Sequence, residues 1–298
     1  MEYKNLGRTS LAVSRIGFGC MSLKMDNEGN ESLLHHALDQ GINYFDTADL
    51  YDKGKNEELL GRTFKNIRDK VIIATKAGNQ WRKDGSGWDW NPRKDYILKC
   101  ADESLRRLQT DYIDLYQLHG GTMEDPVDET IEAFEILKQQ GKIRYYGLSS
   151  IRPVVIREWV KRSGIVSVMT QYSLLDRRPE ETSLPFLLEN NIAVMTRGTI
   201  AQGLLINKPP APYLDHSLEE VKQAAEIITQ VSDGKRTKLQ STVQYVLQHP
   251  AITSAIIGIR TKEQLEEALH IPSAPGLSDN EMQLLDQHIP SKRYKEHR

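Results

Sequence analysis

Residues 111–150 read DYIDLYQLHGGTMEDPVDETIEAFEILKQQGKIRYYGLSS, and they contain one complete strand–helix–strand unit. The apolar run at 112–119 predicts a buried strand, because a strand covered on both faces is continuously apolar rather than alternating. The Asp-Pro pair at 125–126 predicts a capped helix start, and Gly141 predicts its end. A second apolar run at 143–149 completes two parallel strands joined by a helix.

This alternation of apolar run and amphipathic helix is repeated along the whole chain. The runs lie at residues 15–19, 42–47, 71–76, 112–119, 143–149, 166–172, 192–197 and 252–258. Eight strand–helix units are the number that closes a parallel sheet into a barrel. We therefore expect an α/β protein, a single-domain (β/α)8 TIM barrel over residues 1–298.

Two segments lie outside the repeat. Residues 1–12 predict an N-terminal β-hairpin that covers the floor of the barrel. Residues 207–235 form a long insertion with helical character around 218–231, and loops of this length above a barrel are usually functional.

An open, doubly wound sheet is the alternative fold. It would need a glycine-rich nucleotide loop between the first strand and its helix. The stretch GFGCMS at 17–22 matches that pattern only in part, because Ser22 stands where a third Gly or Ala is required.

Composition excludes several classes of protein. The 298 residues are 39% hydrophobic and 27% charged, with a formal net charge of -2, which is ordinary for a globular protein and unlike a basic nucleic-acid binder. The N-terminus resembles no signal peptide, and no apolar run is long enough for a membrane helix. Two cysteines, Cys20 and Cys100, are too few for a disulfide framework. We expect a cytoplasmic protein with neither nucleic acid nor membrane as a partner; the sequence carries no signal for its oligomeric state.

Polar residues occupy the ends of three consecutive predicted strands. Asp46, Lys76 and His119 lie there, and Tyr51 lies in the loop after Asp46. Catalytic groups of barrels come from these strand ends and the loops that follow. Each residue alone also has a structural explanation, as a solvated strand end, a packed ring or a satisfied histidine, but the four together favour a site.

These four residues are suited to proton donation. Free tyrosine has a pKa near 10, a nearby ammonium lowers it, and a carboxylate keeps that ammonium charged. A neutral histidine can hydrogen-bond a substrate oxygen and polarise it. No metal site is expected. A barrel lysine that forms a Schiff base, as in an aldolase, is a different possibility for Lys76.

Three segments resemble the signature blocks of the aldo-keto reductase superfamily. They are GINYFDTADLY at 41–51, VIIATKAG at 71–78 and DYIDLYQLH at 111–119. The similarity runs from about residue 3 to about residue 270. It implies an enzyme that reduces aldehydes or ketones to alcohols by hydride transfer from NADPH.

The resemblance also implies a role for each residue of the group. Tyr51 would be the general acid, Lys76 would tune it, Asp46 would pair with Lys76, and His119 would orient the carbonyl. Asp114, in the third block, we interpret as structural. Relatives of the same fold also serve as cofactor-binding regulatory subunits with little turnover, which is the alternative function.

The resemblance implies that NADPH/NADP+ binds in an extended form without a Rossmann fold. The matching positions are Gly19, Cys20, Met21, Ser149, Gln171, Arg197, Gly198, Gly203, Leu205, Gly258, Arg260, Gln264 and Glu267. Thr261 and Gln264 predict a capping box there, and Arg260 beside a helix N-terminus suits a phosphate, which favours NADPH over NADH.

The sequence departs from the family pattern at four positions in or beside this set. Ser150 replaces the usual Asn, Arg197 replaces an aromatic residue, and Ile257 and Ala268 replace a common Pro and Asn. The planar guanidinium of Arg197 could stack on the nicotinamide as an aromatic ring does, or Arg197 could be a plain surface residue.

Three tryptophans, Trp81, Trp88 and Trp90, lie in the loop after the third predicted strand. They could form an apolar wall of the substrate pocket, or they could pack that loop onto the barrel. The sequence does not identify the substrate.

Overall fold

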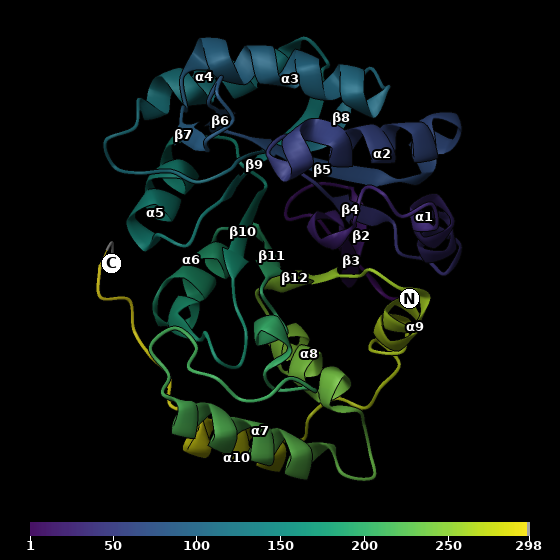
Figure 1. Cartoon of the computed structure of the whole chain (residues 1–298). Coiled ribbons are helices and arrows are strands. Elements are labelled where there is room, and N and C mark those ends of the chain that lie inside the picture. Colours follow the sequence, from purple (N-terminus) through teal and green to yellow (C-terminus); the bar gives the residue numbers. More distant parts are fainter. Residues whose placement is uncertain (297–298) are drawn as a thin grey trace.

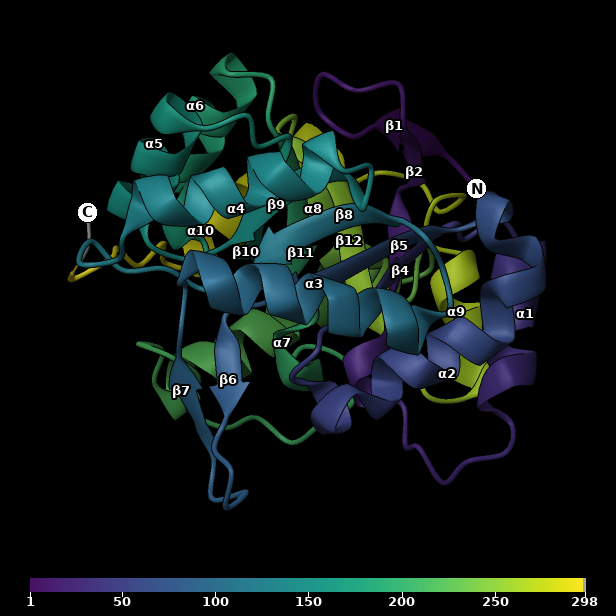
Figure 2. The same ribbon diagram turned by 90° about the horizontal axis from the view of Figure 1, so that it is seen from above.

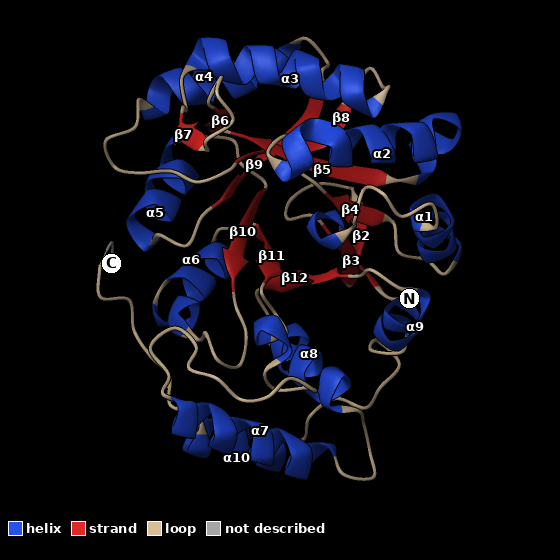
Figure 3. Cartoon of the chain, in the orientation of Figure 1, coloured by secondary structure: helices blue, strands red, loops and turns tan. Residues whose placement is uncertain are grey.

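The computed structural model describes residues 1–296 and contains one closed barrel of parallel strands. Helices surround the strands (Figures 1 and 3). The strands in barrel order are β10 (Ser167–Gln171), β11 (Ala193–Arg197), β12 (Ile252–Gly258), β3 (Ile16–Gly19), β4 (Tyr44–Asp46), β5 (Ile72–Ala77), β8 (Ile113–Leu118) and β9 (Ile143–Ser149). The predicted (β/α)8 barrel is confirmed, and the open doubly wound sheet is wrong.

The ten α-helices of the described part of the chain cover the barrel and extend beyond it. They are α1 (Asn30–Asp39), α2 (Lys55–Phe64), α3 (Lys94–Leu108), α4 (Val127–Gln139), α5 (Pro153–Arg162), α6 (Ser183–Glu189), α7 (Leu218–Ser232), α8 (Lys238–Gln248), α9 (Lys262–Leu269) and α10 (Asp279–His288). The predicted helix in the insertion is confirmed as α7, which packs beside α10 near the C-terminus (Figure 1).

Side chains alternate between the barrel interior and the layer under the helices, as the period of a strand requires. On β4, Phe45 packs against Phe64 of α2 in the outer layer, whereas Tyr44 belongs to the interior cluster with Ile72 and Leu115. Residues two positions further along a strand therefore also point inward. This alternation directs the final residues of several strands toward the barrel axis.

The N-terminal hairpin closes the floor of the barrel. Strands β1 (Tyr3–Asn5) and β2 (Ala12–Ser14) pair antiparallel, so the predicted hairpin is confirmed and extends two residues beyond its predicted end. Leu6 and Val13 are fully buried in the interior cluster. Gly7 has a φ of +56°, and a Cβ there would lie 2.6 Å from the carbonyl oxygen of Val166, so this close approach requires glycine.

The Asp-Pro pair starts a helix differently from the prediction. Pro126 is the N-cap of α4, which begins at Val127. The Asp125 carboxylate does not cap it; instead it accepts hydrogen bonds from Trp90 Nε1 at 2.8 Å and from the Thr122 amide at 2.7 Å. The aspartate thus anchors a neighbouring loop, because an indole N–H lies within its reach.

The tryptophan loop forms a second hairpin, which the sequence did not predict. Strands β6 (Asn79–Trp81) and β7 (Trp88–Trp90) pair antiparallel at the opposite end of the barrel from β1 and β2 (Figure 2). The Trp90 ring lies directly over Gly78 and Gly120, whose added Cβ atoms would be 2.7 and 2.9 Å from it. Trp90 therefore packs the loop onto the barrel, whereas Trp88 is 48% exposed.

Over residues 1–296, every helix is too short or too polar to cross a bilayer.

Candidate active site

Three adjacent strands bring their terminal polar residues to the same end of the barrel. Asp46 ends β4, Lys76 is the fifth residue of β5, and His119 follows β8 directly. Lys76 pairs in register with Gln117 of β8. His119 follows Gln117 by two residues, so its side chain lies on the same, inward face of the strand. Tyr51 begins the short 3-10 helix η2 (Tyr51–Gly54) above them. The structure thus places the four predicted residues together.

Lys76 is the centre of this group and is completely buried. Its Nζ donates to Asp46 Oδ1 at 2.6 Å and to the Thr47 carbonyl oxygen at 2.6 Å. The Oη of Tyr51 lies 3.5 Å from the same Nζ. Asp46 is also buried, so the ammonium and the carboxylate form an ion pair shielded from water.

His119 lies beside Tyr51 on the other side from the ammonium. The two ring centroids are 5.9 Å apart, and the rings are nearly perpendicular at 82°. The Nδ1 atom of His119 is buried and has no hydrogen-bond partner. The His119 amide donates to the Ala77 carbonyl oxygen, so β5 holds the backbone from which the ring projects.

Burial controls the ionisation of the tyrosine. Burial raises the pKa of Tyr51 above its ordinary value of 10.0, although the charge of Lys76 acts in the opposite direction. The expected lowering by Lys76 is therefore present but smaller than the effect of burial, and the sequence-based expectation of a lowered pKa is wrong. Tyr51 holds its proton at neutral pH, as a proton donor requires.

Lys76 and His119 are shifted in opposite directions. Burial favours the neutral amine of Lys76, but Asp46 and then Tyr51 outweigh it, and the pKa of Lys76 lies above 10.5. Burial, followed by the charges of Lys76 and Arg197, lowers the pKa of His119 to about 3. The site therefore combines a charged lysine with a neutral imidazole.

A buried asparagine that the sequence reasoning missed supports this group. Asn56 in α2 donates from Nδ2 to the Cys20 carbonyl oxygen at 2.9 Å, and its Oδ1 accepts from Thr47 Oγ1 at 2.7 Å. It therefore ties the end of β3 to the residue whose carbonyl oxygen accepts from Lys76. No sequence signal marks Asn56, since its partners lie 36 and nine positions away.

Gln171 and Arg197 form a second cluster at the same end, on neighbouring strands β10 and β11. Arg197 Nη1 donates to Gln171 Oε1 at 3.0 Å, and Gln171 Nε2 donates to Asp176 Oδ2 at 2.9 Å. Asp176 is buried and is in turn bound by Arg178 at 2.7 Å. Arg197 is thus exposed but held by a side-chain partner. Sequence reasoning missed Asp176 and Arg178.

The other predicted cofactor positions lie at the ends of β3 and β9 and in the loop after β11, and they differ in how exposed their side chains are. Ser149 ends β9 at the same end of the barrel, and Gly198 directly follows β11 with a φ of +66°. Met21 is 69% exposed, whereas the Cys20 and Leu205 side chains are buried in the core. Only the backbone of Cys20 and Leu205 could therefore contact a ligand.

Three glycines complete that set. Gly19 and Gly258 pair at the ends of β3 and β12, where a Cβ on Gly19 would lie 3.2 Å from the Ile257 carbonyl oxygen. Gly203 has a φ of +87° in the loop after β11. Gly19 therefore permits the close approach of β12, and Gly203 takes a backbone conformation that glycine favours.

The start of α9 borders a cavity of about 370 Å³. Its lining residues are Asn27, Gly29, Ser32, Leu33, His36, Arg260, Thr261 and Lys262. Sequence reasoning identified Arg260 but missed Lys262, whose place beside the same helix N-terminus could have marked it. Ser32 and His36 come from α1, and only the packing of α1 on α9 brings them there.

Gln264 and Glu267 do not line this cavity. Thr261 Oγ1 accepts from the Gln264 amide at 3.3 Å, and Gln264 Oε1 accepts from the Arg260 amide at 2.9 Å. The predicted capping box is therefore half correct: the threonine caps, but the glutamine bonds one residue before it. Glu267 is exposed on α9.

Within residues 1–296, no three His, Cys, Asp or Glu side chains are placed to hold a metal ion.

Comparisons with known proteins cover nearly the whole chain. The model of the "Aldo/keto reductase family" matches residues 15–290. An uncharacterized oxidoreductase of Bacillus subtilis (strain 168), YqkF, is 48% identical over 307 aligned residues, which cover 100% of both chains. An aldo-keto reductase of Schizosaccharomyces pombe, yakc [NADP(+)], is 35% identical over 67% of this chain and 62% of its own.

A solved structure has nearly the same backbone. The holo form of aldo-keto reductase AKR11C1 from Bacillus halodurans has a TM-score of 0.94 and 45% identity, covering 100% of this chain and 99% of that chain. The apo form of the same protein has a TM-score of 0.86 and 41% identity, covering 100% and 99%. The present backbone is thus more similar to the holo form.

Proposed function

The chain belongs to the aldo/keto reductase family, and we propose that it is an NADPH-dependent oxidoreductase that reduces aldehydes or ketones to alcohols. One observation carries the proposal. A protonated tyrosine, Tyr51, lies 3.5 Å from the ammonium of Lys76, which is itself paired with Asp46 in a water-shielded site. This arrangement can release a proton and stabilise the anion that remains.

The residues present fit a nicotinamide dinucleotide phosphate. Arg260 and Lys262 flank the N-terminus of α9 in the 370 Å³ cavity, and cations beside a helix N-terminus suit a phosphate. The guanidinium of Arg197, held by Gln171, is available to stack on a planar ring. The family uses nicotinamide cofactors, and the printed name of the S. pombe relative includes NADP(+). These observations support NADPH over NADH.

The bound dinucleotide would supply a hydride to the carbonyl carbon of the substrate. Tyr51 Oη donates its proton to the carbonyl oxygen as negative charge develops there. The ammonium of Lys76 stabilises the resulting tyrosinate, and Asp46 together with the Thr47 carbonyl oxygen keeps that ammonium in place.

His119 supplies a neutral hydrogen-bond donor beside the acid. Because its pKa is lowered to about 3, the imidazole carries one N–H at neutral pH. That N–H can bond the carbonyl oxygen and orient it toward Tyr51. A charged imidazolium would instead compete with Tyr51 as the acid.

The geometry does not favour a Schiff-base role for Lys76. A nucleophilic lysine must be a neutral amine, whereas Lys76 donates to Asp46 and to the Thr47 carbonyl oxygen and has a raised pKa. Its ammonium is therefore committed to the ion pair.

Replacement of the proton donor tests the proposal. In Tyr51→Phe, we expect kcat for NADPH oxidation with an aldehyde and ketone panel to fall by about 10²–10⁴-fold, the range attributable to general acid catalysis. The dissociation constant for NADPH, measured by fluorescence titration, should change by less than about twofold. Tyr3→Phe is the matched control, because Tyr3 is exposed on the floor hairpin.

Two outcomes would contradict the proposal in different ways. Reduction by Tyr51→Phe at the wild-type rate would show that another group donates the proton. A wild-type protein that binds NADPH but turns over no carbonyl compound would instead favour the cofactor-binding regulatory role.

A further inference from the structure

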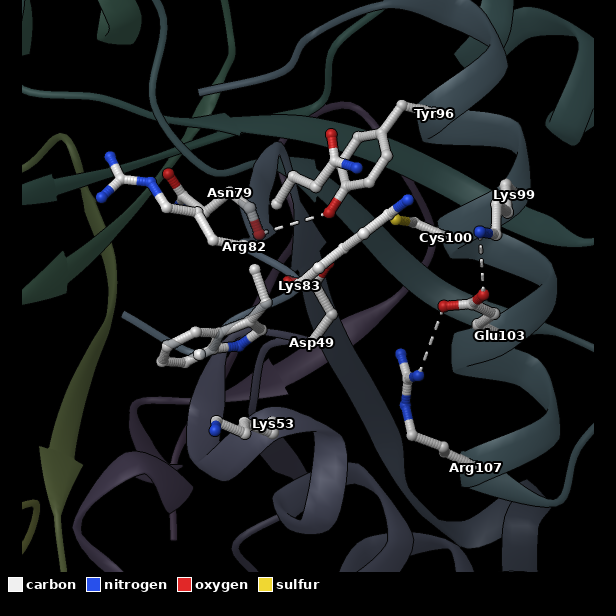
Figure 4. Close-up of a pocket in the computed structure, with 13 residues that line it drawn as sticks. Asp49, Lys53, Asn79, Arg82, Lys83, Tyr96, Lys99, Cys100, Glu103 and Arg107 are labelled. Atoms are coloured by element: carbon white, nitrogen blue, oxygen red, sulfur yellow. Dashed lines mark hydrogen bonds and ion pairs between the residues drawn. The ribbon is translucent and has the colours of Figure 1, made fainter. Parts of the chain in front are cut away.

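A second cavity lies outside the barrel, behind the loop that carries Tyr51. It has a volume of about 440 Å³ and lies between that loop, the β6–β7 hairpin and α3 (Figure 4). Asp49 and Lys53 line it from the loop, Trp81 and Lys83 from the hairpin, and Cys100 from α3. Tyr51 is not among the lining residues, so this cavity is distinct from the candidate active site.

Positive charge dominates the cavity wall. Lysines and arginines from all three elements line it, whereas its acidic residues are Asp49 and Glu103. The cations are Lys53, Arg82, Lys83, Lys99 and Arg107.

Three of these cations already have carboxylate partners. Arg82 pairs with Asp89 at 2.6 Å, and Arg107 pairs with Glu57 at 2.6 Å. Lys99 lies 3.7 Å from Glu103 (Figure 4).

Two lysines remain available for a ligand. Among residues 1–296, no carboxylate pairs with Lys53 or Lys83. Lys53 Nζ lies 5.2 Å from the centroid of the Trp81 ring, so this contact holds the lysine at the cavity edge without neutralising its charge.

Two polar atoms of the lining residues lack partners. Asp49 Oδ1 and Trp81 Nε1 are both inaccessible to solvent and have no hydrogen bond. Burial, and then the negative charge of Glu57, raises the pKa of Asp49 to about 8. Asp49 therefore adds little negative charge to the cavity wall at neutral pH. Neither atom is exposed to the cavity, so the charge complementary to an anion comes from the cations of the wall.

We propose that this cavity binds a phosphate monoester. A phosphate group has a compact charge of about −1.5 to −2 and three acceptor oxygens, which suits donors that approach from a loop, a hairpin and a helix. The volume is within the range of small-molecule pockets, roughly 300–1,000 Å³, so it also has space for an organic group. Asp49 and Lys53 flank Tyr51, so the ligand would contact the catalytic loop from its outer side.

Calorimetric titration with inorganic phosphate tests the proposal. The titration uses the full-length protein at pH 7.5, against sodium chloride of equal ionic strength to remove nonspecific screening effects. It is made in the Arg260→Ala background, because the cavity at α9 is a separate candidate phosphate site. We expect saturable binding that exceeds the chloride blank.

The double variant Lys53→Ala/Lys83→Ala, in the same background, should weaken this binding by about tenfold or more, since charge-assisted hydrogen bonds are the strong ones. Both side chains are exposed, so the thermal midpoint should not change. Lys70→Ala, an exposed lysine outside the cavity, is the matched control and should leave the affinity within about twofold.

Absence of saturable binding in the Arg260→Ala protein would overturn the proposal. So would equal affinity in the double variant and the control, because phosphate would then bind elsewhere.

Discussion

The buried ion pair between Asp46 and Lys76 makes a quantitative prediction. Asp46→Asn keeps the shape of the side chain but removes the charge that lies 2.6 Å from the Lys76 ammonium. Lys76 would then keep only neutral acceptors, the Thr47 carbonyl oxygen and the amide oxygen of the new asparagine. Removing one partner of a buried pair typically costs about 3–5 kcal/mol, because the other charge stays buried without compensation.

Deprotonation of Lys76 sets an upper limit on that cost. Releasing the proton at pH 7 from a lysine with an ordinary pKa of 10.5 costs about 4.8 kcal/mol, at 1.36 kcal/mol per pH unit. At pH 9 the same release costs only about 2 kcal/mol. We therefore expect a loss of about 3–4.8 kcal/mol in the free energy of unfolding at pH 7, falling to about 2 kcal/mol or less at pH 9.

The sign of this pH dependence follows from proton binding. In the variant, the unfolded chain binds a proton at Lys76 that the folded chain does not, so its stability rises with pH. In the wild type, the pKa of Lys76 is raised above 10.5, and this group stays charged over pH 7–9. Asp49, with a pKa of about 8, titrates in both proteins and cancels from the difference.

Urea unfolding followed by circular dichroism at pH 7 and pH 9 measures both quantities. Asp102→Asn is the matched control, because Asp102 Oδ1 also lies 2.6 Å from a lysine, Lys142, but the side chains are 59% and 34% exposed. Exposed pairs contribute about 0–1 kcal/mol. A loss in Asp46→Asn no greater than in the control, or a loss that does not shrink at pH 9, would refute the reasoning.

Three further predictions concern other parts of the molecule. Asp114 is fully buried and accepts from Arg68 at 2.6 Å and from Arg144 at 2.9 Å. Asp114→Ala should therefore lower the free energy of unfolding by about 3–5 kcal/mol. A urea midpoint equal to that of the wild type would contradict this. Because the pKa of His119 is about 3, kcat for carbonyl reduction should show no histidine ionisation between pH 5 and 8, and a step near pH 6.5 that disappears in His119→Asn would show the imidazole to be charged. Because the pKa of His119 is lowered only in the folded protein, the free energy of unfolding should fall as the pH falls from 6.5 toward 3. Over that range only the unfolded chain binds the proton. Arg260→Ala should weaken NADPH binding by about tenfold and NADH binding by less than about twofold, if the guanidinium contacts a phosphate that only NADPH carries; equal losses in fluorescence titration would place Arg260 elsewhere.

Much of the fold could be predicted from the periodicity of the sequence. The runs at 112–119 and 143–149 became β8 and β9, because strands buried on both faces need apolar residues at every position. The β6–β7 hairpin could not be predicted in this way. Half-buried Trp81 pairs with exposed Trp88 across the hairpin. Trp90 is held by two glycines and by Asp125, which are distant in the sequence.

The candidate site likewise contains residues that the sequence could place and residues that only the tertiary structure brings together. Asp46, Lys76 and His119 could be placed together from the sequence, because parallel strands of one barrel all end at the same rim. The cavity residues Ser32 and His36 could not, since they belong to α1 and reach Arg260 only because α1 packs on α9.

The sequence by itself determined which residues end the strands and therefore which chemical groups meet at the rim of the barrel. Only the tertiary structure decided how those groups ionise. Sequence reasoning expected Lys76 to lower the pKa of Tyr51, but burial raises it further than the ammonium lowers it. Burial depends on closure of the whole barrel and on Asn56 and Thr47 around the ammonium. Desolvation is a property of all surrounding atoms, and no spacing along the chain encodes it.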